Sequence, residues 1–213
     1  MAKAESSPQL HVQLFEQDLG LPHGWYFALM KDSDWTFVIK LFALCEGAIN
    51  YLLQQHFENR SVSEFLARLN MNGRTGKLRL SRKLAAIGSD ESRFIEKLAD
   101  IRNHCIHDVR NVSFVFSDYY AGLKSDQKKM LLALFEPFIH GAVGPGSIVM
   151  PLTEFVEKNW KLSFWMAGIQ VLSSIYLTSE RARVEATWTN NMVKTGILST
   201  KFDEIFPASE YND

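Results

Sequence analysis

The sequence has little of what usually reveals an enzyme class. It has two cysteines, Cys45 and Cys105, in 213 residues, and no apolar signal segment opens the chain "MAKAESSPQ". This usage is typical of a reducing compartment, so we expect a cytoplasmic protein. No nucleophile elbow, Rossmann glycine pattern or kinase-type motif is present. The stretch "GAVGPGS" (141–147) lacks the Lys-Ser/Thr of a phosphate loop and is interpreted as a connection.

An excess of charge of either sign is also missing. The chain has 23 Lys and Arg against 24 Asp and Glu, which gives a net charge of -1. Long-range attraction to nucleic acid or to an anionic membrane is therefore not expected. Any site for phosphate has to be built locally.

The sequence has no clean membrane-spanning run. A spanning helix needs about 20 mostly apolar residues. The longest uncharged stretch includes residues 162–178, which carry the polar side chains of Ser163, Gln170, Ser173, Ser174 and Thr178. We predict a buried helix there and no membrane partner.

Strand patterns are sparse, and helical periodicity dominates instead. Apolar residues recur at three- and four-residue spacing in segments near 34–57, 64–69, 77–87, 89–107, 125–140 and, with an interruption, 153–188. Ser61 and Glu64 suggest a capping box, and Gly88 suits the residue just past a helix end. "NVSFVFS" (111–117) is predicted as a short strand or extended linker, and the tail 206–213 as frayed.

These patterns predict an all-α helical bundle with additional C-terminal helices. Residues 1–30 are expected to be irregular, although "LHVQLFEQ" (10–17) suits a short helix or strand. A helical core follows over 31–117. Residues 118–213 are expected to form a C-terminal helical extension packed on the same domain.

The densest polar cluster, "IRNHCIHD" (101–108), lies at the end of the helix predicted over 89–107. In a helix, Asn103 and His107 share a face and Arg102 lies beside Asn103, while Ile101 and Cys105 turn toward the core. Cationic and amide side chains near a helix C-terminus also satisfy its free carbonyl groups. The cluster therefore either finishes the helix or forms a site.

The order of elements around this cluster resembles the HEPN superfamily of small helical domains, and within it the mannitol operon repressor branch. The resemblance covers about residues 34–112. It includes the long helix "FVIKLFALCEGAINYLLQQHF", a short helix, the turn "NGRTGK", the helix "LRLSRKLAAIG" and a helix ending in R-N-x-x-x-H. Arg102, Asn103 and His107 match the signature of the superfamily, an arginine, four residues and a histidine, with a polar residue after the arginine.

The resemblance implies a metal-independent endoribonuclease, often a toxin or a stress- or phage-defence protein, with a site shared across a homodimer. Other members are inactive regulatory or binding modules. The side chains suit RNA cleavage: His107 can exchange protons near neutral pH, Arg102 can hold phosphate oxygens, and Asn103 can donate to phosphate or orient the histidine. With one such histidine per chain, two motifs meeting across a two-fold axis would supply both acid and base. No metal or cofactor is expected.

Other charged residues are candidates for supporting roles. Glu46 lies in the apolar run "FALCEGAI" and is expected either to pair with Arg102 or to lie on a solvated edge. His104 is a second titrating group or a solvated side chain. A basic stretch forms a solvated helix face that would hold trailing RNA phosphates in a ribonuclease: Lys77, Arg79, Arg82 and Lys83.

Two further features have simpler interpretations. Cys45, His104, Cys105 and His107 would supply four zinc ligands, but no Cys-x-x-Cys pair exists and both cysteines fit apolar stripes. An aromatic stripe is predicted as core or dimer contact rather than as a ligand platform: Trp160, Phe164, Trp165 and Tyr176.

Two functions from different classes follow. The first is a HEPN-type endoribonuclease with an RNA substrate and an antitoxin or regulatory protein partner. The second is a non-catalytic regulatory protein that resembles the mannitol operon repressor and acts through protein contacts.

Overall fold

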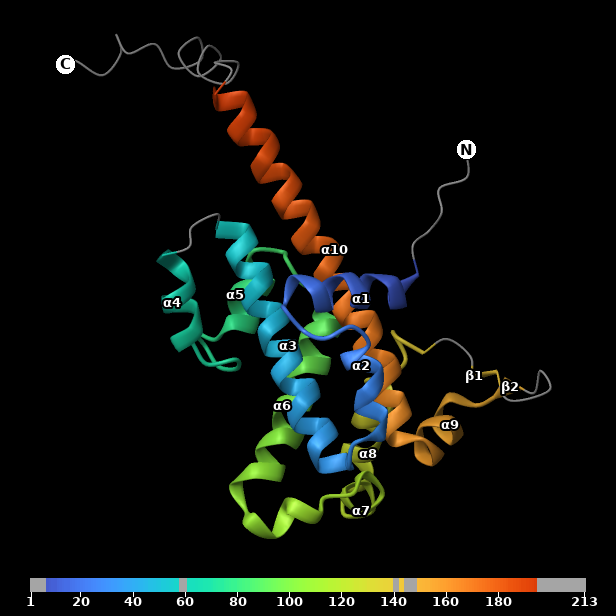
Figure 1. Ribbon diagram of the computed structural model, residues 1–213. Coiled ribbons are helices and arrows are strands. Elements are labelled where there is room, and N and C mark those ends of the chain that lie inside the picture. The colour runs from blue at the N-terminus through green and yellow to red at the C-terminus, as the bar shows by residue number, and fades with distance from the viewer. Residues whose placement is uncertain (1–6, 58–60, 140–141, 144–148, 195–213) are drawn as a thin grey trace.

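The protein is an all-α helical bundle (Figure 1). The computed structural model describes residues 7–57, 61–139, 142–143 and 149–194. In chain order the helices are α1 (Pro8–Asp18), α2 (Trp25–Ala28), η1 (Leu29–Lys31), α3 (Asp34–Phe57), α4 (Ser61–Arg68), α5 (Lys77–Lys83), α6 (Ser89–His107), η2 (Val109–Ser113), α7 (Phe116–Ala121), α8 (Ser125–Ala133), α9 (Leu152–Lys158) and α10 (Trp160–Lys194). Two-residue strands β1 (Ala142–Val143) and β2 (Val149–Met150) form an antiparallel pair.

Helix α3 is the centre of the bundle, with α4, α5, α6 and α10 packed around it. It begins where Ser33 Oγ accepts a hydrogen bond from the backbone N–H of Thr36 at 3.2 Å. Its buried residues recur at helical spacing: Phe37, Val38, Leu41, Phe42, Leu44, Cys45, Ala48, Ile49, Leu52 and Leu53. Among the described helices, α3 is the one long and apolar enough to cross a membrane, and 56% of that stretch is buried inside the bundle.

The N-terminal segment is more ordered than predicted. Pro8–Asp18 form α1, with Ser7 as its N-cap and Pro8 in its first turn. The helix packs along α10, and the buried Glu16 accepts hydrogen bonds from the backbone N–H groups of Gly24 and Tyr26 at 2.8 and 2.7 Å. Residues 8–18 are therefore not irregular, and of the two alternatives left open for 10–17 the helix agrees with the structure.

Two local predictions between α5 and α7 are also wrong. Helix α5 ends at Lys83, and Ala85, not Gly88, takes the left-handed conformation with a φ of 52°. "NVSFVFS" contributes to η2 and α7 rather than to a strand, because Phe114 and Phe116 turn into the core and pack against each other.

The stretch predicted as helical over 153–188, with an interruption, forms two helices, α9 and α10, which are separated at Asn159. α10 packs along α3 and α1, and its last turns extend beyond the bundle (Figure 1). Trp160 and Phe164 are buried, and Trp165 and Tyr176 pack against the core, which confirms their structural interpretation. The side chains of residues 61–63, residues 141 and 144–147 of the connection, and the tail 206–213 lie outside the described part of the chain.

Candidate functional site

Helix α6 carries the polar cluster on the edge of its buried face. Ile101 and Cys105 are buried in the core at 0% and 2% exposure. Arg102 and Asn103 are half-buried, whereas His107 is exposed. This division follows the 3.6-residue period of the helix and agrees with the sequence pattern.

Other residues finish the C-terminus of α6. Trp35 Nε1 donates to the carbonyl oxygen of Cys105 at 3.1 Å, and Asn111 Nδ2 donates to that of His104 at 2.7 Å. Among the described contacts, no side chain of Arg102, Asn103 or His107 donates to a backbone carbonyl. The cluster is therefore not needed to cap its own helix.

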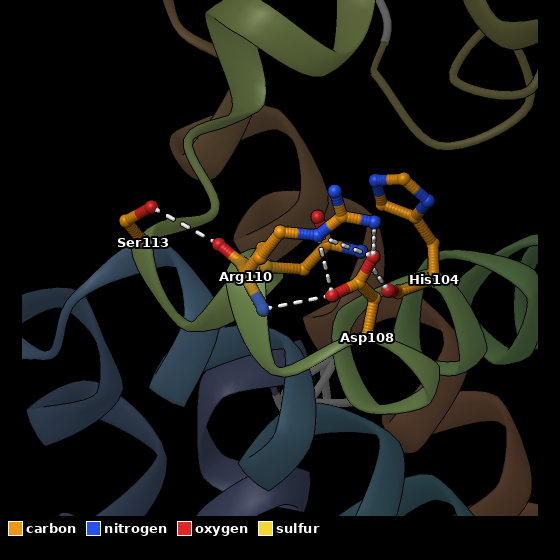
Figure 2. A network of polar contacts seen from close by, with 5 residues as sticks. His104, Asp108, Arg110 and Ser113 are labelled. Carbon is orange, nitrogen blue, oxygen red and sulfur yellow. Dashed lines mark hydrogen bonds and ion pairs between the residues drawn. The ribbon is translucent and has the colours of Figure 1, made fainter.

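Asp108 is the residue between α6 and η2, and Figure 2 shows its carboxylate bound by Arg110. Arg110 donates to it from its backbone N–H at 2.9 Å and from Nε and Nη2 at 3.0 and 2.6 Å. These hydrogen bonds, the side-chain bonds first, lower the pKa of Asp108. Asp108 thus has a structural role at the turn.

Arg102 lies at the wall of a cavity of about 500 Å³ between α3, α6 and the chain after α4. Its Nη1 donates to Asn103 Oδ1 at 3.1 Å, and its Cζ lies 5.4 Å from the centroid of the Phe42 ring. Among the described residues, no carboxylate pairs with its guanidinium. The polar lining of the cavity is Glu46, Arg68, Asn70, Asn72, Arg102 and Asn103.

Glu46 is paired, but not with the predicted partner. Its Oε1 accepts a hydrogen bond from Lys77 Nζ at 2.9 Å. The Lys77 side chain is 1% exposed, against 38% for Glu46. The expected pair with Arg102 is therefore replaced by a pair with Lys77, although Glu46 and Arg102 line the same cavity.

The two histidines of the polar cluster, His104 and His107, lie outside this cavity. His104 packs its ring against Phe114 and Tyr119 and lines a separate hollow of about 460 Å³. His107 is one turn beyond Asn103 on the same face of α6 and is exposed. A single chain therefore brings Arg102 and Asn103 together but does not enclose His107 with them.

The basic stretch of α5 divides between two faces. Arg79, Arg82 and Lys83 are exposed and line a hollow of about 470 Å³ together with Gly73 and Glu96. Lys77 points inward to Glu46, so its assignment to the solvated, phosphate-binding face is wrong.

The zinc alternative has no geometric support. Among the residues that the structure describes, no group of three or more His, Cys, Asp or Glu side chains is placed to hold a metal ion. Burial raises the pKa of Cys45 to about 12 and that of Cys105 to about 11. At neutral pH both side chains are therefore protonated thiols within the packed core.

The loop after α4 supplies cavity residues that the sequence did not single out. Asn70 and Asn72 line the cavity, and Asn72 Oδ1 is buried without a hydrogen-bond partner among the described residues. A Cβ at Gly76 would lie 2.5 Å from the carbonyl oxygen of Asn72, so the close turn requires glycine. The glycines of "NGRTGK" were the only sequence signal for this turn.

Comparison of the chain with protein-family models, with curated proteins and with solved structures found no match in any of the three.

Proposed function

We propose that the protein is a metal-independent endoribonuclease of the HEPN type that acts through Arg102, Asn103 and His107. The observation that carries this proposal is the Arg102 guanidinium, which lines a cavity with no paired carboxylate among the described residues. A planar guanidinium binds phosphate oxygens through two parallel hydrogen bonds. The motif thus offers a phosphate ligand rather than a helix cap.

The reaction requires two proton transfers and one stabilised charge. A base removes the proton of a ribose 2'-hydroxyl, and the resulting oxygen attacks the adjacent phosphorus. The bond to the 5'-oxygen then breaks as that oxygen takes a proton from an acid, which leaves a 2',3'-cyclic phosphate and a free 5'-hydroxyl. His107 serves as base or acid, and Arg102 stabilises the phosphorane charge.

The proposed enzyme is a homodimer that joins two such motifs. Four apolar residues that lie near His107 in the sequence are exposed: Ile106 (40%), Val109 (88%), Val112 (63%) and Val115 (42%). Exposed apolar residues that cluster mark interaction surfaces. A second copy on this surface would bring its His107 to the Arg102 of the first, where that one His107 can take the 2'-hydroxyl proton as base and then give it to the 5'-oxygen as acid.

One face of α6 would guide the RNA. Glu96, Ala99, Asn103 and His107 recur at helical spacing and share that face. Glu96 borders the basic hollow, and Ala99 and Asn103 border the Arg102 cavity. RNA phosphates on one side of the cleaved bond would therefore meet exposed cations, from Arg79, Arg82 and Lys83.

The test is cleavage of labelled RNA by purified protein in the presence of EDTA. Wild type is expected to cut, and His107→Ala and Arg102→Ala to lose about 100-fold or more in rate. His23→Ala and Lys129→Ala remove an exposed histidine and an exposed lysine elsewhere and should keep wild-type activity. Absence of cleavage by wild type on varied single-stranded and structured RNAs would contradict the proposal.

The second candidate is a non-catalytic regulatory protein that resembles the mannitol operon repressor. It is favoured by the position of His107, which the single chain leaves outside the Arg102 cavity. In that case the exposed apolar surface after α6 would bind a protein partner, and neither RNA binding nor cleavage would depend on Arg102. In the cell, the first candidate suits a cytoplasmic toxin, stress or phage-defence role with an antitoxin, and the second a regulatory complex.

A further inference from the structure

Lys77 is a buried charge that the proposed reaction does not use. Its side chain is 1% exposed and its Nζ lies 2.9 Å from Glu46 Oε1. The backbone fixes it there, because the N–H of Lys77 donates to the carbonyl of Asn70 at 2.9 Å and that of Leu78 to the carbonyl of Met71 at 3.1 Å. The turn that closes the cavity therefore also aims Lys77 at α3.

The charges of Glu46 and Arg102 lie on the wall of the same cavity. Phe42 and Glu46 are one turn apart on α3, so their Cβ atoms lie about 5–6 Å from each other. The Arg102 guanidinium lies 5.4 Å from the Phe42 ring, and both Glu46 and Arg102 line the cavity. A carboxylate without a partner on this wall would be drawn to the guanidinium.

We infer that Lys77 is a positioning residue: it binds Glu46, keeps the carboxylate away from Arg102 and leaves the guanidinium open to a phosphate. The inference rests on the proposed function in one respect, that this phosphate belongs to RNA. The Lys77–Glu46 pair is neutral as a whole, so the cavity retains the positive charges of Arg68 and Arg102. Glu46 competes with the ligand for Arg102 whenever Lys77 is removed.

The experiment measures binding of a labelled single-stranded RNA in the His107→Ala background, where cleavage is blocked. Lys77→Met is expected to weaken binding about tenfold, since a charged hydrogen bond of Arg102 is lost to Glu46. Adding Glu46→Gln to Lys77→Met removes the competing charge and should restore binding to within about twofold. A packing role for Lys77 would not be rescued this way, because Met remains at position 77.

Two controls test whether the change in RNA binding comes from the net charge of the protein, and whether it acts through Arg102. Lys129→Met and Asp126→Asn make the same charge changes on the exposed face of α8 and should alter binding less than about twofold. In an Arg102→Ala background, Lys77→Met should have no further effect. Unchanged binding by Lys77→Met, or failure of Glu46→Gln to rescue it, overturns the inference.

A second variant decides the matter if Lys77→Met does not fold. Glu46→Gln alone removes the carboxylate that Lys77 is inferred to hold away from Arg102, so RNA binding should stay within about twofold of wild type or tighten. Binding weaker than this overturns the inference, because the Glu46 carboxylate would then support the ligand rather than compete with it.

The outcomes distinguish this inference from the proposed function. Cleavage by wild type, with binding that is insensitive to Lys77→Met, refutes the positioning role and leaves the ribonuclease. Binding that depends on Lys77, with no cleavage by wild type, supports the positioning role and refutes catalysis. Absence of both binding and cleavage refutes both.

Discussion

Replacing Asn103 by Asp tests whether a carboxylate beside Arg102 blocks the site. The substitution is isosteric, and it places a negative charge where Asn103 Oδ1 already accepts a hydrogen bond from Arg102 Nη1 at 3.1 Å. Two charges about 4 Å apart attract by about 4 kcal/mol at an effective dielectric constant of 20. Solvent and side-chain entropy reduce the net gain in such a half-exposed pair to about 1 kcal/mol.

The expected result is a change of opposite sign in stability and in binding. The free energy of unfolding of Asn103→Asp, from urea titration, should rise by about 0.5–1 kcal/mol. Its affinity for RNA, measured by fluorescence anisotropy in the His107→Ala background, should fall about tenfold, because a phosphate has to break the new pair. Gln17→Glu makes the same chemical change on an exposed face of α1 and controls for net charge. Wild-type RNA affinity in Asn103→Asp would refute a phosphate-binding role for Arg102.

Two further predictions concern the core. A Cβ at Gly168 would lie 2.4 Å from the hydroxyl oxygen of Tyr26, so Gly168→Ala should lower the free energy of unfolding by about 1–3 kcal/mol. Adding Tyr26→Phe to Gly168→Ala should recover part of this loss. Equal stability of Gly168→Ala and wild type would contradict the close contact. Burial raises the pKa of Cys45 to about 12 and that of Cys105 to about 11. A thiol reagent at pH 7.5 should therefore label neither cysteine in the native protein and both in denaturant. Rapid labelling of Cys45 in the native protein would contradict its burial.

The helices with a continuous apolar period could be predicted from the sequence. α3 and α6 carry buried residues every three or four positions, and their predicted ranges agree with the structure. The sequence left the 11-residue α1 open as a short helix or strand within an irregular segment, since its order depends also on distant contacts: Glu16 binds the backbone of residues 24 and 26, and His11 Nδ1 and Ser173 Oγ lie 2.6 Å apart. Tertiary contacts of this kind leave no local pattern in the sequence.

The candidate site shows the same division. The positions of Arg102 and Asn103 on the edge of α6 follow from helical spacing. The partner of Glu46 does not, because it depends on the loop that closes over the cavity and turns Lys77 inward. A sequence places charges on a helix face, but which pair forms in a half-buried cavity is decided by the elements that meet there.

The angular separation of Arg102 and His107 bears on how a dimer would be built. Five residues along a helix correspond to a rotation of about 140°, so one chain does not aim both side chains at one phosphate. A site that combines Arg102 of one copy with His107 of the other resolves this difficulty. Mixing Arg102→Ala and His107→Ala proteins, each inactive alone, would then restore activity in the mixed dimers.

The expected recovery can be estimated from subunit statistics. Random exchange of equal amounts makes about half of the dimers mixed, and one of the two sites in each mixed dimer is intact, so about a quarter of wild-type cleavage should return. The control is the activity of the same mixture before its subunits exchange. Exchange is then brought about by mild denaturation and refolding. No recovery in verified mixed dimers would refute a site that combines Arg102 of one copy with His107 of the other. Each site would then use Arg102 and His107 of the same chain, or all four of these side chains of the dimer.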